Sequence, residues 1–150
     1  MPKGVFMAAI NQITQEISVI LPKLMRYAST NQFSKVNVTP AQIIMLASIH
    51  DHGRCKIKTL AKERRISPPT ATGLIDRLVK GKYVKRDSDP EDRRVVMVSL
   101  TEKGENTVRN YLKAIKNVWK NILTCLTVEE QRQYLNILKK IVGTLSEAKG

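Results

Sequence analysis

The stretch from Tyr83 to Gly104 reads YVKRDSDPEDRRVVMVSLTEKG, and it decides the fold. Its first four residues, 83–86, favour a short strand, and residues 87–90 (Asp-Ser-Asp-Pro) are turn formers. Residues 95–100 are mostly β-branched or apolar and predict a second strand that returns beside the first. The sequence therefore predicts a β-hairpin with a charged tip.

The predicted hairpin presents one face to a core and carries two arginines near its tip. Strand alternation places Val96, Val98 and Leu100 on the core side. Arg93 and Arg94 stand just before the second strand. Because a basic helix-turn-helix candidate comes immediately before it, we interpret the hairpin as the wing of a winged-helix DNA-binding domain. An arginine on such a wing can enter a narrow minor groove, where negative potential is concentrated.

The positive charge of the chain is concentrated in one segment. The formal net charge is +13 over 150 residues, and residues 54–86 hold eleven Lys or Arg against two acids. Such a concentration is typical of a surface that binds a polyanion. A solvated basic surface without a ligand has the same composition, but the helix-turn-helix and the hairpin beside it favour nucleic acid.

Two short helices are predicted within this basic segment. Residues 57–65 form the first, with Leu60 and Ala61 facing inward. Ser67 caps the second, and Pro68 takes its first position. The inward stripe of the second helix follows the i, i+3, i+4, i+7 spacing and consists of Ala71, Leu74, Ile75 and Leu78. The opposite face of this helix is predicted to enter a DNA groove.

The candidate DNA-binding residues lie mainly on that opposite face and on the hairpin. We expect modest base reading by Thr70, Thr72 and Arg77, with much of the specificity coming from groove shape. Arg77 can either grip a guanine or hold a phosphate. Asp92 and Arg94 are expected to pair and fix the hairpin tip. The full predicted set is Lys58, Ser67, Pro69, Thr70, Thr72, Gly73, Arg77, Lys80, Arg86, Asp92, Arg93 and Arg94.

Further helices are predicted on both sides of this domain. The first covers residues 6–30 and contains Pro22, where a kink or break is expected, and a loop follows over residues 29–37. The next begins with the capping box Thr39-Pro40-Ala41-Gln42 and ends at Gly53. After the hairpin, helices are predicted over residues 102–124 and onward from a second capping box at residues 127–130.

These flanking helices carry apolar seams that one short chain does not need for its own core. The simplest way to bury them is an intertwined two-fold dimer. A three-helix bundle within one chain is the alternative. The seam positions are Ile10, Ile13, Ile17, Ile20 and Leu24 in the first helix; Val108, Leu112, Ile115, Trp119, Ile122 and Leu126 after the hairpin; and Leu135, Leu138, Ile141, Val142 and Leu145 in the last helix.

Composition and spacing argue against several other classes of protein. No apolar run approaches the ~20 residues needed to cross a membrane, and the N-terminal segment is too weakly patterned for a signal peptide, so a cytoplasmic protein is expected. Cys55 and Cys125 follow no metal-binding or redox spacing, which predicts two free thiols. His50 and His52 with Cys55 lack a fourth ligand, so no metal or other cofactor is expected. No phosphate-binding glycine loop or catalytic triad is recognisable, and the chain is not expected to be an enzyme.

With these residues in view, the chain resembles the MarR family of winged-helix transcriptional regulators over nearly its whole length. The hairpin residues Asp89, Asp92, Arg93 and Arg94 resemble the family's D-x-x-D-x-R signature, and residues 100–104 resemble its L-T-x-x-G signature. Residues 74–78 (LIDRL), followed by Gly81 at the predicted helix end, resemble its recognition helix.

The resemblance implies a homodimer that binds pseudo-palindromic operators in double-stranded DNA. Members commonly repress transcription and are released by small phenolic or lipophilic ligands held between the dimerisation and DNA-binding parts. Two departures stand out. Family members often carry Arg or Ser where this chain has Gly73, and the reactive cysteine of the peroxide-sensing members, near the start of the first helix, is absent.

We therefore expect a mainly α protein with a small β-hairpin wing (α+β). Residues 38–101 are predicted to form a winged helix-turn-helix domain, and residues 1–37 and 102–150 a helical dimerisation region. The predicted function is dimeric, sequence-specific DNA binding that regulates transcription. A non-specific, basic architectural nucleic-acid-binding protein is the alternative.

Overall fold

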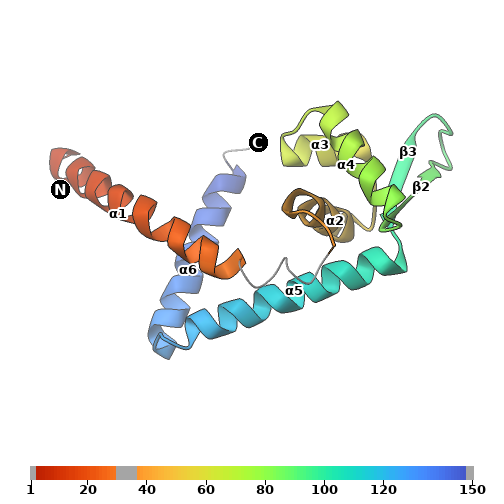
Figure 1. Ribbon diagram of the computed structural model, residues 1–150. Helices are drawn as coiled ribbons and strands as arrows, with labels where there is room; N and C mark the ends of the chain where they lie inside the picture. Colours follow the sequence, from red (N-terminus) through yellow and green to blue (C-terminus); the bar gives the residue numbers. More distant parts are fainter. Residues whose placement is uncertain (1–2, 30–36, 148–150) are drawn as a thin grey trace. The chain divides into compact units, whose positions relative to one another are not determined.

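The computed structural model describes residues 3–29 and 37–147, and it confirms a mainly helical protein with a small sheet. The chain divides into two compact units, Met1–Ala114 and Ile115–Gly150. The elements follow one another as α1 (Lys3–Ser29), α2 (Pro40–His52), β1 (Arg54–Lys56), α3 (Ile57–Arg64), α4 (Pro68–Lys80), β2 (Val84–Ser88), β3 (Val96–Leu100), α5 (Glu102–Leu123) and α6 (Val128–Glu147) (Figure 1).

The helix ends inside the first unit follow from local capping chemistry. Thr39 and Gln42 form both halves of the predicted capping box at the start of α2, and Pro40 takes the first helical position. Gly53 ends α2 with φ of 71°, a conformation that favours glycine. The predicted start and end of this helix are thus confirmed, because both depend on residues within one turn.

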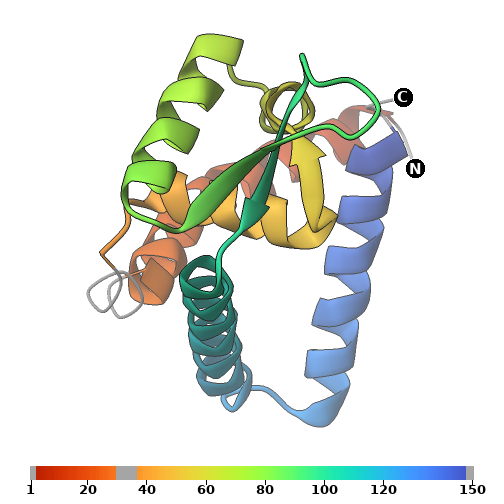
Figure 2. The same ribbon diagram turned by 90° about the vertical axis from the view of Figure 1, so that its right-hand side faces the viewer.

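The sheet has three antiparallel strands in the order β1-β3-β2. Val84 pairs with Leu100 and Ser88 with Val96 in the predicted hairpin. The third strand, β1, is not predicted by the sequence; its Cys55 pairs with Val98, and β1 lies on the other side of β3 from β2 (Figure 2). Three residues are too few to show strand alternation, so only the tertiary pairing reveals this strand.

The core of the first unit lies between the helices and this sheet. Its largest fully buried side chains are Ile43, Met45, Leu46, Ile49, Leu60, Ile75, Leu78, Val98 and Val108. Val98 and Leu100 face this core as predicted, whereas Val96 is 46% exposed. Val96 pairs with Ser88 at the far end of the hairpin, where the strands have run beyond the packed helices.

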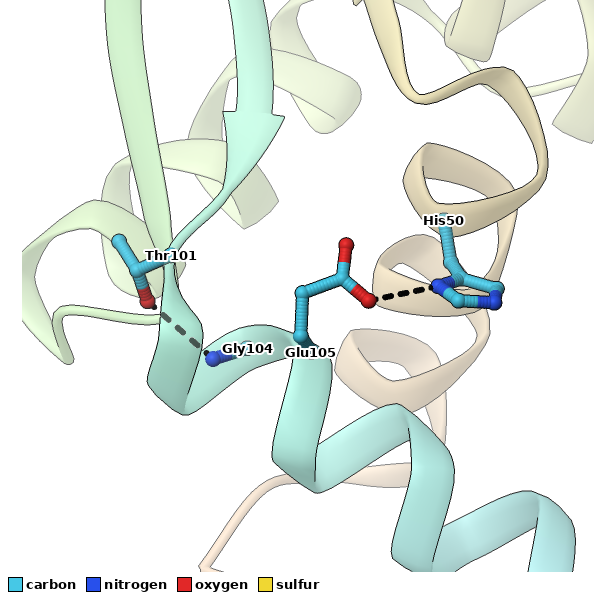
Figure 3. Close-up of polar contacts among 4 residues, drawn as sticks. All are labelled: His50, Thr101, Gly104 and Glu105. Atoms are coloured by element: carbon cyan, nitrogen blue, oxygen red, sulfur yellow. Dashed lines mark hydrogen bonds and ion pairs between the residues drawn. The ribbon is translucent and has the colours of Figure 1, made fainter.

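The start of α5 is locked against the end of α4 by the residues of the L-T-x-x-G signature. The Thr101 hydroxyl donates to the Lys82 carbonyl at 2.7 Å and accepts from the Gly104 N–H at 3.2 Å (Figure 3). A Cβ on Gly104 would lie 2.1 Å from the Tyr83 carbonyl oxygen, far inside contact distance. Glycine at this position is therefore a steric requirement.

Helix α1 continues through Pro22, so the expectation of a break there is wrong, and a kink within the continuous helix stays a prediction. The loop predicted over residues 29–37 lies almost entirely outside the described residues. The expectation that no segment could cross a membrane is contradicted on length and composition, because Gly4–Ala28 is long and apolar enough to do so. None of this segment is buried within the chain, and Glu16 lies near its middle, where a carboxylate would be costly inside a bilayer.

The second unit is a helical hairpin built from the end of α5 and from α6. Thr127 and Glu130 form the predicted capping box at the start of α6, with hydrogen bonds in both directions. The Gln131 amide donates to the carbonyls of Leu123 and Leu126 and so closes the turn. The apolar positions of α6 are exposed in the single chain, among them Leu135 (50%) and Val142 (60%).

Candidate nucleic-acid interface

Helix α4 is built as a recognition helix, with one face buried and the other free. Ser67 caps it by accepting a hydrogen bond from the Thr70 N–H, and Pro68 stands at its first position, as predicted. Ala71, Ile75 and Leu78 are buried, and Leu74 packs against the core. Among the predicted DNA-contacting residues of α4, Gly73 is half-buried. The exposed ones are Pro69, Thr70, Thr72, Arg77 and Lys80.

The turn before α4 sets the angle of this helix. Helix α3 ends at Arg64, and the C-cap residue Arg65 adopts the left-handed conformation with φ of 53°. Ile66 follows in the turn and packs partly against the core. Lys58, on the exposed side of α3, is the member of the predicted set that this helix provides.

The two aspartates of the wing signature fold the tip. The Asp89 carboxylate accepts a hydrogen bond from the Glu91 N–H at 3.0 Å, and the Asp92 carboxylate accepts one from the Arg94 N–H at 2.9 Å. Each is a local turn in which an aspartate side chain bonds the backbone two residues on. The spacing of the signature is therefore explained by backbone geometry at the tip.

Asp92 and Arg94 brace the tip together as expected, but not through a pair of side chains. Asp92 contacts the backbone of Arg94, and the Arg94 guanidinium is not part of any ion pair among the described residues. Arg93 is likewise exposed and outside those ion pairs. The tip therefore presents two cations whose charge no neighbouring carboxylate compensates by direct contact.

Arg86, another predicted DNA contact, is held by the recognition helix. Its guanidinium forms an ion pair with the Asp76 carboxylate, which links β2 to α4. The pair places Arg86 at the base of the wing and partly neutralises it. We therefore assign Arg86 a positioning role, in which it fixes the angle between the wing and α4.

Two residues that the sequence analysis did not single out also support the wing. The Arg54 guanidinium donates to the Ser88 carbonyl at 2.8 Å, from β1 to the far end of β2. The Lys103 ammonium donates to the Gly81 carbonyl and lies 4.1 Å from the centre of the Tyr83 ring. Both contacts join residues that are far apart in sequence, so no local sequence pattern predicts them.

The predicted position of Gly81 at the end of α4 is confirmed. Gly81 ends α4 with φ of −75°, and the left-handed residue is Lys82, with φ of 61°. A Cβ on Gly81 would lie 2.7 Å from the Tyr83 ring. The glycine therefore makes room for the tyrosine that Lys103 covers.

The two histidines at the end of α2 each bind a glutamate. His50 Nδ1 lies 2.9 Å from Glu105 Oε2 on α5 (Figure 3), and His52 Nε2 lies 2.6 Å from Glu63 Oε2 on α3. The hydrogen bond from His52 lowers the pKa of Glu63. These contacts join the end of α2 to α3 and to the start of α5.

The two cysteines occupy different environments. Cys55 is buried in the sheet, and this burial, together with the charge of Glu63, raises the pKa of its thiol. A raised pKa disfavours the reactive thiolate. Cys125 is exposed near the turn that joins α5 to α6. Both thiols are free, as predicted.

The Arg86–Asp76 pair leads to a prediction about stability. Both side chains are more than a third exposed, so we expect Arg86→Ala to reduce the free energy of unfolding by less than about 1 kcal/mol. A double-mutant cycle with Asp76→Ala, measured by denaturant unfolding, should return a coupling of about 0.2–1 kcal/mol. A coupling of zero would contradict the prediction and show that the pair does not stabilise the fold.

Comparison with known proteins identifies the fold and the family. Residues 38–96 match the sequence profile of the MarR family. The chain is 30% identical over 138 residues to the transcriptional repressor MdtR of Bacillus subtilis, covering 90% of this chain and 89% of that protein.

Two solved structures show how far this likeness extends. The YusO protein of Bacillus subtilis superposes with a TM-score of 0.73 at 29% identity, covering 91% of this chain and 96% of that one. A mutant MarR from E. coli, solved in complex with operator DNA, superposes with a TM-score of 0.67 at 25% identity, covering 89% of this chain and 95% of that one. The wing, the recognition helix and the likeness over nearly the whole chain together place this protein in the MarR family.

Proposed function

We propose that this protein is a homodimeric, sequence-specific DNA-binding repressor of transcription. The exposed face of α4 and the uncompensated arginines of the wing tip support it, because a recognition helix and a wing can occupy a major groove and the adjacent minor groove. The similarity to MdtR, a transcriptional repressor, and to a MarR structure with operator DNA supports the same role. It acts by binding in the cytoplasm and not as an enzyme.

The observation that carries the proposal is the wing tip. Asp89 and Asp92 direct their carboxylates to backbone N–H groups, so the tip is folded without using the guanidinium groups of Arg93 and Arg94. Those two guanidinium groups are therefore free to enter a narrow minor groove, where the negative potential that attracts a cation is strongest.

Sequence-specific binding is tested by comparing two DNA duplexes. A duplex selected from a random library by the wild-type protein should bind on the order of 10³-fold more tightly than a scrambled duplex of equal length in the same salt. Equal affinities would favour the non-specific architectural protein instead. Salt concentration is held fixed, because phosphate contacts make both affinities steeply salt-dependent.

The dimer is proposed to form through residues 1–37 and 102–150. The apolar seams of α1 and α6 support it: Ile13 and Ile17 are 56% and 52% exposed in the single chain, and Ile141 is 49% exposed. Large apolar surfaces of this kind mark protein interfaces. A second copy of the chain is the partner that would bring two recognition helices onto one duplex.

Sedimentation should show a dimer at micromolar concentration, and Ile13→Glu should dissociate it. The glutamate would be buried twice in a two-fold interface, and each buried unpaired charge costs several kcal/mol. The dissociation constant should therefore rise at least about 1,000-fold. Gln15→Glu is the matched control, since it adds the same charge on the opposite face of α1 and should leave the dimer intact. A monomeric wild-type protein would contradict the proposal.

We further propose that a small phenolic or lipophilic ligand releases the protein from DNA. The family resemblance supports this, because such ligands sit between the dimerisation and DNA-binding parts of related regulators. The test is a panel of phenolic acids added to the preformed protein–DNA complex. A ligand that acts in this way weakens DNA binding and raises the melting temperature of the free protein.

A further inference from the structure

Gly73 stands in the middle of the recognition helix, where nothing inside the protein requires a glycine. A glycine in a helix interior costs about 0.5–1 kcal/mol relative to alanine. The backbone at Gly73 does not adopt a positive φ, and a Cβ built there meets no described atom within 4 Å. Both usual reasons for a glycine, a left-handed backbone and a close internal neighbour, are therefore absent. The space beside the Gly73 Cα is therefore open to a molecule that approaches from outside.

The missing side chain leaves a hollow on the exposed face of α4. Its volume is about 410 Å³, and it is lined by Pro69, Thr70, Gly73, Leu74 and Arg77. Pro69 and Leu74 supply apolar carbon atoms, while Thr70 and Arg77 supply a hydroxyl and a guanidinium. Thr70 is already oriented, because its hydroxyl lies 2.7 Å from the Ser67 hydroxyl.

The chemistry of this lining matches one feature of a DNA major groove. Base edges in that groove present hydrogen-bonding groups, and only thymine adds an apolar one, its C5-methyl. A methyl group that enters the hollow can contact the carbon atoms of Pro69 and Leu74, whereas an exocyclic amine against those atoms would lose water without full compensation. Arg77 is outside the ion pairs of the described residues, so its donors are free for a neighbouring acceptor on the DNA.

We propose that the hollow at Gly73 receives a thymine methyl group, which makes Gly73 a residue that determines specificity at one base pair of each half-site. The inference rests on the proposed function, since it needs α4 to lie in a major groove. In this contact the methyl group occupies the space that a side chain at position 73 would otherwise fill. A larger residue at this position would fill the space that the methyl occupies.

The test combines Gly73→Ala with single-atom changes in the DNA. The duplex selected by the wild-type protein is synthesised with each thymine replaced in turn by deoxyuridine, which removes the methyl and keeps the hydrogen-bonding edge. Wild-type affinity should fall about fourfold at one thymine per half-site, the worth of burying one methylene-sized group. Gly73→Ala should bind the unmodified duplex less tightly and be indifferent to deoxyuridine at that thymine. The other thymines serve as controls.

Stability separates this effect from misfolding. Because alanine favours the helix and meets no neighbour, Gly73→Ala should raise the melting temperature of the free protein by roughly 2–4 °C. A variant that is more stable and yet binds DNA less well supports the inference. Unchanged affinity would overturn it, as would a loss that is the same on every duplex, which would point to a backbone approach instead. If the wild-type protein selects no duplex at all, the proposed function itself fails.

Discussion

Replacing Gly104 with alanine is expected to lower the melting temperature of the protein by roughly 10 °C. The added Cβ would lie 2.1 Å from the Tyr83 carbonyl oxygen, and that oxygen also accepts the Thr101 N–H at 3.0 Å. The position of the Cβ is fixed by the backbone of Gly104, and the oxygen belongs to the backbone of Tyr83, so neither atom can rotate away. Forced overpacking costs about 1–3 kcal/mol, and a lost hydrogen bond adds about 1 kcal/mol. The measurement is thermal unfolding followed by circular dichroism at a fixed protein concentration.

Gly73→Ala is the matched control for this experiment. It makes the same chemical change in a helix of the same unit, at a site where the new Cβ meets open space. Its melting temperature should stay the same or rise. If Gly104→Ala were as stable as wild type, the close approach of α5 to Tyr83 would not exist in solution.

Replacing Arg94 with alanine is expected to weaken operator binding by about 1–3 kcal/mol for each wing, which is roughly 5- to 150-fold. The reason is that the Arg94 guanidinium is exposed and unpaired among the described residues, while its backbone N–H already holds the tip through Asp92. The substitution removes the cation and leaves that backbone contact intact. Affinity is measured by fluorescence anisotropy over a range of salt concentrations.

The salt dependence tells whether Arg94 touches the DNA. Each lost contact should reduce the slope of log affinity against log salt by about one, so a dimer should lose about two. Arg109→Ala is the control, since Arg109 is exposed on α5 and its loss changes the net charge equally. Arg109→Ala should alter neither the slope nor the affinity appreciably. Equal effects of the two substitutions would mean that only the overall charge matters.

The sequence predicted those features that depend on neighbouring residues. Thr39 and Ser67 cap their helices as expected, because a cap and its partner lie within one turn. The inward stripe of α4 was also predictable, since helical periodicity fixes which side chains share a face. These local rules were sufficient to place the recognition helix and the wing.

The features that the sequence did not predict depend on contacts between distant segments. Strand β1 is defined by its pairing with β3, and the Arg54 contact to Ser88 crosses 34 positions. The contact between Asp92 and Arg94 was predicted, but opposite charges two residues apart suggested an ion pair between their side chains. The carboxylate instead satisfies a backbone N–H, which is nearer and is fixed by the turn.

Steric requirements were equally invisible. Gly104 belongs to a recognisable signature, yet its cause is the Tyr83 carbonyl, 21 positions earlier in the chain. Gly81 was assigned to the helix end by its residue type, whereas its space is occupied by an aromatic ring. In both cases the position of the glycine can be predicted from the sequence, whereas the steric reason for it is found only in the packing against Tyr83.

A hydroxyl-radical protection footprint of the wild-type protein on the intergenic DNA that flanks its own gene shows whether the protein binds DNA as a symmetric dimer. We expect a two-fold symmetric pattern in which the centres of two protected half-sites lie about 10 base pairs apart, with the adjacent minor grooves also protected by the wings. Even protection along the fragment, or protection of a single half-site without symmetry, would contradict it.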